Sequence, residues 1–304
     1  MKTMSFETLD FLLERSMTGK TMVLAVAAPH GEDILGAVAE AKDKGVISPI
    51  LIGDRKRMEK IASGLSIDLS SFDIEEEPDD AKAVEIAVKA VSLGKADLLM
   101  KGNVKTATLL KAVLDKEWGL RSGSLLSHLF LFEIPKMNRV FGMTDGGMSM
   151  YPDLKTKQGI IENAAACYHK LGVKCPKMAA LAAVEVVNPD MPCTIDAAAL
   201  AQMNRRGQIK GCIVDGPLAL DNAVSEESAR HKGIVSDVAG HADILVVPDI
   251  EAGNLLGKAM LYMSGGRGAG VILGARKPIV LTSRFDNAET KLLSIALGAV
   301  LAKA

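Results

Sequence analysis

Short apolar runs alternate with amphipathic stretches along most of the chain, and this alternation constrains the possible fold more than any other feature. The apolar runs at 22–28 and Ile47–Gly53 predict strands, while 32–44, with acidic residues in its first turn, predicts the helix between them. Strands that alternate with helices indicate an α/β fold, with a mostly parallel sheet covered by helices on both faces. Because crossovers between parallel strands are right-handed, the carboxyl ends of the strands share one edge, where ligands bind.

The same alternation continues to the end of the sequence. An acidic segment at 75–80 predicts a solvated turn before a helix. Further strands are predicted at 97–100, 125–134, 139–144, 178–183, 212–214, 243–247, 271–273 and 279–282. Further helices are predicted at 79–93, 106–114, 154–171, 195–206, 226–231, 255–263 and from 288 onward.

Length and composition narrow the class of protein further. The 304 residues exceed the usual size of one core, so one large or two smaller lobes are expected, and 48% apolar but only 4% aromatic residues suit buried parallel strands. A net charge of −1 gives no field that attracts nucleic acid or an anionic membrane. No apolar run of about 18 residues is present. Because Glu7, Asp10 and Glu14 also interrupt any signal peptide, we expect a cytoplasmic protein.

A polar turn beginning with Lys101 and Gly102 follows the predicted strand at 97–100. Gly102 lets the backbone approach a ligand closely, and the amino end of the next helix can hold an anion. Lys101, Lys105 and Thr106 add hydrogen-bond donors. The turn therefore predicts an anion-binding site, with an ordinary strand-to-helix loop bearing surface lysines as the alternative.

Two later turns have a similar layout. Asp215, Gly216 and Pro217 follow an apolar strand, where the carboxylate either orients a ligand or anchors the loop. Gly253 and Asn254 open a predicted helix after another strand, and Asn254 either caps that helix or binds a ligand. Both turns are therefore candidate binding segments.

Ser283 and Arg284 stand side by side between the last predicted strand and the final helix. A hydroxyl beside a guanidinium suits an oxyanion or a phosphate group. Asp286 or Glu289 can accept a proton or hold the guanidinium in place. The alternative is a helix-capping turn without a role in catalysis.

Other motifs are incomplete or absent. The segment at 253–258, GNLLGK, has three residues between its glycines where a P-loop has four, and Ala259 follows its lysine where the motif has Ser or Thr. The glycine-rich segment at 264–270 follows a predicted helix and is interpreted as a loop. The sequence shows no C-x-x-C pair and no dense His, Asp and Glu cluster, so no metal site is predicted. Candidates to line an acyl pocket are Met143, Met148 and Met150.

Seven stretches of the chain occur in the same order in one known family. They are MKGNVKTATLLKAVL (100–114), LSHLFLFE (126–133), TDGGMSMYPDLKTKQGIIENA (144–164), PKMAALAAVEVVNPDMPCTIDAA (176–198), DGPLALDNAVSEESARHKGI (215–234), ADILVVPDIEAGNLLGK (242–258) and PIVLTSRFDNAETKLLS (278–294). Together they resemble the phosphate acetyl/butyryl transferase family from about residue 95 to the end. The resemblance is closer to the butyryl branch, because Pro217 stands where the acetyl branch tends to carry an acid.

The resemblance implies two α/β lobes with an active-site cleft between them, the architecture shared with isocitrate and isopropylmalate dehydrogenases. It places residues 1–138 and 271–304 in the first lobe and 139–270 in the second. It also implies a homodimer or an assembly of dimers, with small-molecule substrates as the other partners.

The family's catalytic Ser-Arg pair carries over onto Ser283 and Arg284. Its nearby acid corresponds to either Asp286 or Glu289, and the spacing leaves both open. Candidates for the further arginines of the acetyl branch are Arg121 and Arg139, or Lys101 and Lys105 in their place.

The reaction that the resemblance implies exchanges coenzyme A and inorganic phosphate on a short-chain acyl group. Both are substrates, and no permanently bound cofactor or metal is expected. Short acyl groups differ by methylenes worth about 1 kcal/mol each, so the sequence leaves the acyl chain open. The alternatives are phosphate acetyltransferase specificity, a metal-dependent decarboxylating dehydrogenase on the same architecture, and a non-catalytic acyl-CoA or acyl-phosphate binding module.

Overall fold

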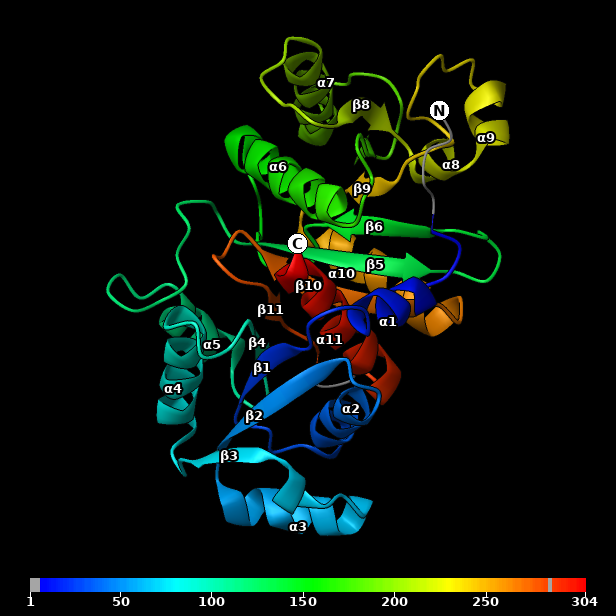
Figure 1. Cartoon of the computed structure of the whole chain (residues 1–304). Helices are drawn as coiled ribbons and strands as arrows, with labels where there is room; N and C mark the ends of the chain where they lie inside the picture. Colours follow the sequence, from blue (N-terminus) through cyan, green and yellow to red (C-terminus); the bar gives the residue numbers. More distant parts are fainter. Residues whose placement is uncertain (1–5, 284–285) are drawn as a thin grey trace. The chain divides into compact units, whose positions relative to one another are not determined.

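The structure is a computed structural model that describes residues 6–283 and 286–304 (Figure 1). The chain forms two compact units. The terminal unit consists of Leu9–Ser124 and Gly268–Ala304, and the middle unit of Leu125–Arg267 with residues 6–8. Among the described residues, no helix combines the length and apolar character needed to cross a membrane.

A sheet with the strand order β3-β2-β1-β4-β11-β10 forms the centre of the terminal unit. Neighbouring strands are parallel except β10 and β11, which are antiparallel. Because β1 lies between β2 and β4, Ala27 at its end lies opposite both Ile52 and Lys101. The strands are β1 (Met22–Ala27), β2 (Ile47–Gly53), β3 (Asp73–Glu76), β4 (Leu98–Lys101), β10 (Arg267–Leu273) and β11 (Ile279–Val280).

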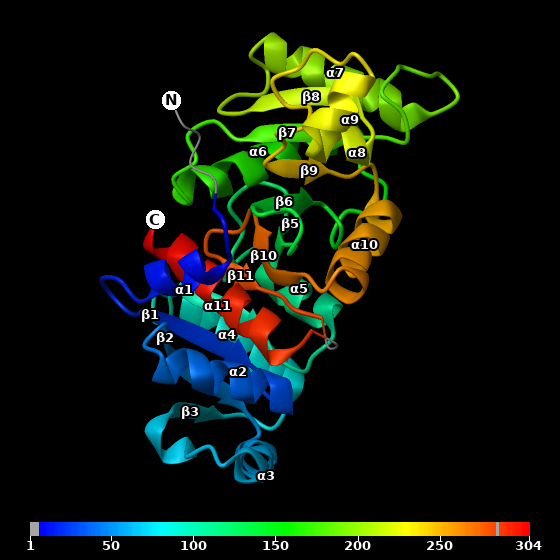
Figure 2. The ribbon, with the colours of Figure 1, turned by 90° about the vertical axis from the view of Figure 1, so that its right-hand side faces the viewer.

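Helices cover both faces of this sheet (Figures 1 and 2). α2 and α11 pack together on one face, with α1 against α11, whereas α4 and α5 lie on the other face. Every residue of α11 from Thr290 to Leu301 is buried, because this helix is largely apolar on all sides. The helices are α1 (Asp10–Ser16), α2 (Glu32–Asp43), α3 (Arg55–Leu65), a 3₁₀ turn (Leu69–Ser71), α4 (Asp80–Ser92), α5 (Thr106–Val113) and α11 (Ala288–Lys303).

In the middle unit, the strands follow one another in the order β5-β6-β9-β7-β8. β5 and β6 are antiparallel, and the other neighbours are parallel. The register between β7 and β8 shifts between Ala179 and Leu181. The strands are β5 (Ser127–Glu133), β6 (Val140–Thr144), β7 (Lys177–Leu181), β8 (Ile213–Leu218) and β9 (Ile244–Val246).

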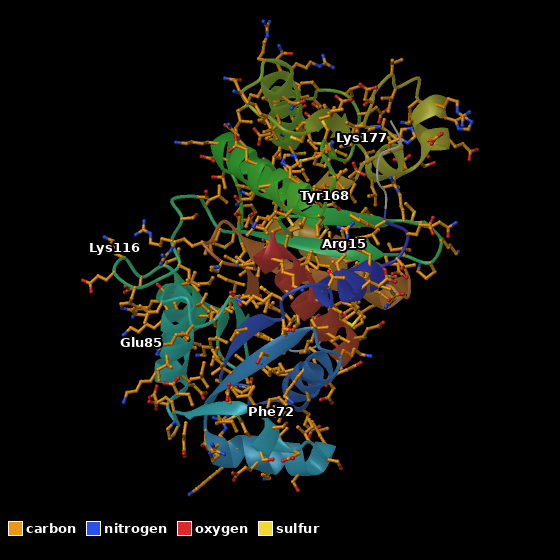
Figure 3. All side chains as sticks on the ribbon, viewed as in Figure 1. Arg15, Phe72, Glu85, Lys116, Tyr168 and Lys177 are labelled. Carbon is orange, nitrogen blue, oxygen red and sulfur yellow. The ribbon has the colours of Figure 1, made fainter. Side chains whose placement is uncertain are left out.

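Helices also pack on the sheet of the middle unit. α6 contacts β5 and β6, α7 contacts β7 and β8, and α10 contacts β6. Tyr168, labelled in Figure 3, lies on α6. Its side chain is buried, and its hydroxyl donates a hydrogen bond to the Asp243 carbonyl at 3.0 Å. The helices are α6 (Leu154–Lys170), α7 (Pro192–Arg205), α8 (Leu220–Val224), α9 (Glu226–His231), α10 (Ile250–Lys258) and a π-helix (Ala259–Met263).

The predicted α/β class with a mostly parallel sheet is confirmed. The family resemblance implied lobe boundaries near residues 138 and 270, whereas the compact units divide after Ser124 and Arg267. The segment 125–138 groups with the middle unit because β5, which it contains, pairs with β6. The predicted cleft between the lobes stays a prediction.

Two predicted segments are wrong in type. Glu75 and Glu76 belong to the edge strand β3 rather than to a turn, and the exposure of their side chains explains why no apolar run marked this strand. The segment 264–270 was predicted as a loop, but only residues 264–266 lie in one, because β10 begins at Arg267.

Two element boundaries also differ from the prediction. α10 begins at Ile250, since the Asp249 carboxylate accepts a hydrogen bond from the Ala252 amide at 2.8 Å and caps the helix there. The prediction that Asn254 caps this helix is therefore wrong. β8 runs to Leu218, so the turn predicted at Asp215 lies within a strand.

Candidate functional site

A pocket of about 120 Å³ lies at the carboxyl ends of β1, β4 and β11, entirely within the terminal unit. Three of its lining residues were predicted as site residues from the sequence: Lys101, Gly102 and Ser283. The sequence did not single out the others, which are Gly31, Asp33, Ile34, Asn103, Thr282 and Lys291. The turns after β4 and β11 therefore meet at the sheet edge where α/β folds bind ligands.

The turn after β4 is held against the turn after β1 by backbone hydrogen bonds. The Gly102 amide donates to the Ala27 carbonyl at 2.9 Å, and the Asn103 amide donates to the Ala28 carbonyl at 2.8 Å. A Cβ on Gly102 would overlap the Ala28 carbonyl oxygen. Glycine is therefore required at position 102 for this close approach of two backbones.

Lys101 is buried at the end of β4, with only 5% of its surface exposed. Its Nζ donates to the carbonyls of Gly102 and Val104, each at 3.1 Å, so the ammonium is held beneath its own turn. The exposed Lys105 and the half-buried Thr106 lie next along the chain at the start of α5 and do not line the pocket. The structure thus brings one of the two predicted lysines into the pocket.

The turn after β11 is closed by Asp286. Its Oδ2 accepts a hydrogen bond from the Ser283 amide at 2.7 Å, and the Ser283 side chain is exposed at the pocket. Asn287, rather than Asp286, caps α11, because its Oδ1 accepts from the Thr290 amide at 2.8 Å. Glu289 is exposed in the first turn of the helix. The predicted site residue Arg284 lies outside the described residues.

Lys291 reaches the same turn from the first part of α11. It is only 1% exposed, and its Nζ donates a hydrogen bond to the Asp286 carbonyl. Burial lowers the pKa of its ammonium, while the carboxylates of Asp33 and Asp286 act in the opposite direction. A second buried cation therefore lines the pocket beside Lys101.

His30 supports the pocket from the turn after β1. Its Nε2 accepts a hydrogen bond from the Asp54 amide at 2.9 Å, so Nδ1 carries the proton and faces Asp80 Oδ1 at 3.3 Å. Burial lowers the pKa of the imidazole, Arg57 acts in the same direction, and Asp80 opposes both. The His30 carbonyl also accepts from the Asn103 amide group at 3.1 Å, which ties the two turns together.

The remaining predicted binding residues lie in the middle unit. Asp215 and Gly216 are half-buried and Pro217 is buried within β8. Gly253 is buried in α10, where an added Cβ would come within 2.6 Å of the Gly146 Cα, and Asn254 is exposed on the same helix. A binding role for these five residues stays a prediction.

The two candidate arginines lie at the amino ends of parallel strands. Arg139 directly precedes β6, and Arg121 pairs with Ala275, which precedes β11. Ligands of α/β sheets bind at the opposite, carboxyl edge. The positions of Arg121 and Arg139 therefore do not favour a role in the pocket.

Asp145 is a further buried group that the sequence analysis missed. It is 2% exposed and follows β6, and its Oδ1 accepts hydrogen bonds from the amides of Gly147 and Met148 at 2.9 and 2.8 Å. Asp145 thus shapes the glycine turn of the middle unit. The position of a lone acid just before two glycines was the available signal in the sequence.

Comparison with known proteins identifies the family. The family profile described as Phosphate acetyl/butaryl transferase matches residues 76–299. The chain is 47% identical to the Clostridium beijerinckii phosphate butyryltransferase, over 96% of this chain and 97% of that protein. It is 46% identical to the Thermotoga maritima phosphate acetyltransferase, over 93% of this chain and 96% of that protein. A solved structure of a branched-chain phosphotransacylase from Enterococcus faecalis is similar with a TM-score of 0.83 and 32% identity, over 93% of this chain and 99% of that one. This chain therefore belongs to the phosphate acetyl/butyryl transferase family.

Proposed function

We propose that this protein is a phosphotransacylase that exchanges coenzyme A and inorganic phosphate on butyryl and similar short-chain acyl groups. The observation that carries the proposal is the 47% identity to a phosphate butyryltransferase along 96% of the chain. The pocket adds physical support, because it gathers two buried lysines and the Ser283 side chain at the ligand-binding edge of a sheet.

In the proposed reaction, an oxygen of hydrogen phosphate attacks the carbonyl carbon of the acyl-CoA thioester. A C–O bond forms, the C–S bond breaks, and the sulfur of coenzyme A leaves with the electron pair. The proton lost by hydrogen phosphate ends on the thiol, so the products are an acyl phosphate and free coenzyme A. Holding phosphate and thioester in one site lowers the entropic part of the barrier.

Ser283, Lys101, Arg284 and one of two acids have proposed roles in this reaction. The Ser283 hydroxyl donates a hydrogen bond to the oxyanion that develops on the carbonyl, and the Lys101 ammonium offsets the charge of phosphate. Arg284 shares these tasks, a role that rests on the family resemblance. In the reverse direction, Asp286 or Glu289 accepts the thiol proton.

The binding of coenzyme A is proposed to extend beyond this pocket. Its contacts are assigned to the predicted residues of the middle unit, Asp215, Gly216, Pro217, Gly253 and Asn254. The predicted homodimer or assembly of dimers belongs to the same proposal.

The proposal is tested by measuring phosphate-dependent release of coenzyme A from acetyl-, propionyl-, butyryl- and isobutyryl-CoA. We expect kcat/KM for butyryl-CoA to exceed that for acetyl-CoA by at least about tenfold, because two methylenes add apolar contacts in the transition state. The reaction without phosphate is the control. Thiol release that is independent of phosphate would contradict the proposal.

Phosphate acetyltransferase activity is the second candidate, and the 46% identity to the Thermotoga maritima enzyme favours it. The same series of acyl-CoAs separates the two activities, because a preference for acetyl-CoA would assign the chain to this second function. Binding of acyl-CoA without thiol release from any substrate would indicate a non-catalytic binding module.

A further inference from the structure

Lys291 is a buried charge that neither the fold nor the proposed chemistry above explains. Only 1% of its surface is exposed, and its neighbours along α11 from Leu292 to Leu301 are buried as well. Lysine is almost never fully buried unless its charge is paired, because removing the ammonium from water is costly. A neutral side chain of similar length would pack in this helix at lower cost.

Lys291 lines the pocket, and its ammonium is bonded to the turn that precedes α11. Its hydrogen bond to the Asp286 carbonyl uses one of the three donors of the ammonium. Among the described residues, the Asp286 carbonyl is the one hydrogen-bond partner of Nζ. Thr282 and Ser283 line the pocket together with Lys291. Donors therefore remain for a ligand that enters the pocket.

The charges around the pocket favour an anion with more than one negative charge. Lys101 from β4 and Lys291 from α11 both line the pocket and are both buried, whereas Asp33 from α2 is exposed at its edge. Cations in a site with little water attract an anion more strongly than surface lysines do. Thr282, Ser283 and Asn103 add groups that can donate to oxygen.

We propose that Lys291 binds the phosphate substrate directly and, through the Asp286 carbonyl, holds the Ser283 turn against that phosphate. The proposal rests on the phosphotransacylase function and assigns the phosphate subsite of that reaction to this pocket. Lys291 is therefore a binding and positioning residue, and Lys101 is the second cation of the subsite.

Lys303 provides a matched control on the same helix. Its Nζ donates to the carbonyls of Ser16 and Thr18, each at 2.6 Å, and burial lowers the pKa of its ammonium as well. It does not line the pocket. If loss of a partly buried lysine from α11 weakens the protein in general, Lys303→Gln shows the same defect as Lys291→Gln. If the defect is specific to phosphate binding, only Lys291→Gln shows it.

The test measures binding of inorganic phosphate by isothermal titration calorimetry, together with the KM for phosphate and for butyryl-CoA. For Lys291→Gln, we expect the Kd and KM for phosphate to rise by about tenfold or more, with the KM for butyryl-CoA within about threefold of wild type. Lys291→Arg keeps the charge and is expected to restore much of the phosphate affinity. Lys303→Gln is expected to leave both phosphate constants unchanged.

Asp33→Asn is a second variant whose folding is not in question, because Asp33 is exposed. Removing a negative charge from the edge of the subsite is expected to tighten phosphate binding by about two- to fivefold. If Lys291→Gln does not fold, an unchanged phosphate Kd in Asp33→Asn overturns the proposal.

Two further results would overturn it. One is a phosphate Kd in folded Lys291→Gln equal to that of wild type, and the other is an equal rise in the KM of both substrates. Calorimetry separates failure of this proposal from failure of the proposed function, because it measures phosphate binding without turnover. A wild-type protein that binds phosphate through Lys291 but releases no coenzyme A would refute the phosphotransacylase activity and leave the phosphate subsite standing.

Discussion

Ser283 presents an exposed hydroxyl at the pocket while its amide is held by the Asp286 carboxylate at 2.7 Å. For Ser283→Ala, we expect kcat to fall by about 10²-fold with little change in the KM for butyryl-CoA, because the hydroxyl stabilises charge that develops only in the transition state. Steady-state kinetics give both constants, and circular dichroism checks that the fold is unchanged. A kcat within about threefold of wild type would remove the hydroxyl from the mechanism.

The two acids after Ser283 differ in their surroundings, and this difference predicts which one matters more. Asp286 closes the turn, whereas Glu289 is exposed in the first turn of α11. We expect Asp286→Ala to lower kcat by at least about tenfold and Glu289→Ala to change it by less than about threefold, since only the former loosens the Ser283 turn. Parallel kinetics of the two variants make the comparison, and the reverse order would assign the proton acceptor to Glu289.

Individual residues also show where sequence reasoning stops. Lys101, Gly102 and Ser283 could be predicted to lie together, because each follows a strand and parallel strands share a carboxyl edge. Lys291 could not be predicted, since a single lysine in a helix ordinarily extends its ammonium to water. Its burial depends on α2 and on the turn after β11. These segments come next to α11 only when the chain folds.

At the scale of elements, the contact between the turns after β1 and β4 depends on Gly102. We expect Gly102→Ala to lower the free energy of unfolding by about 1–3 kcal/mol, because the new Cβ would overlap the Ala28 carbonyl oxygen and force the turns apart. Urea denaturation measures the change. Activity is expected to fall as well, since Lys101 and Asn103 flank this glycine in the pocket.

Gly64 supplies the control for this substitution. It lies in α3 with no atom within 4 Å of an added Cβ, so Gly64→Ala is expected to be neutral or to stabilise the protein by up to about 1 kcal/mol. Equal stability of the Gly102→Ala and Gly64→Ala variants would contradict this prediction, because the turns after β1 and β4 would then move apart at no cost in stability.

Elements with a strongly apolar side were predicted from the sequence, and elements without one were missed. The missed helix α3 buries only Met58 and Ala62, and the missed strand β3 exposes most of its side chains at the edge of the sheet. Hydrophobic periodicity carries no signal where little surface is buried. α1 is also difficult to predict, because it has only seven residues and buries only Leu12 and Ser16.

At the scale of the whole molecule, the chain repeats one design in two units. In each unit the strands are mostly parallel with one antiparallel pair, β10 with β11 in the terminal unit and β5 with β6 in the middle unit. The pocket lined by Lys101 and Lys291 is built from the terminal unit alone. The proposed contacts with coenzyme A assign the middle unit its part in the reaction.

The measurement that tests the central claim most directly is ³¹P NMR of the wild-type protein with butyryl-CoA and inorganic phosphate. The account predicts that a butyryl phosphate resonance appears at the expense of inorganic phosphate, in the same amount as the free thiol released. Thiol release without an acyl phosphate resonance would show that water, not phosphate, receives the acyl group, and that result would contradict the account.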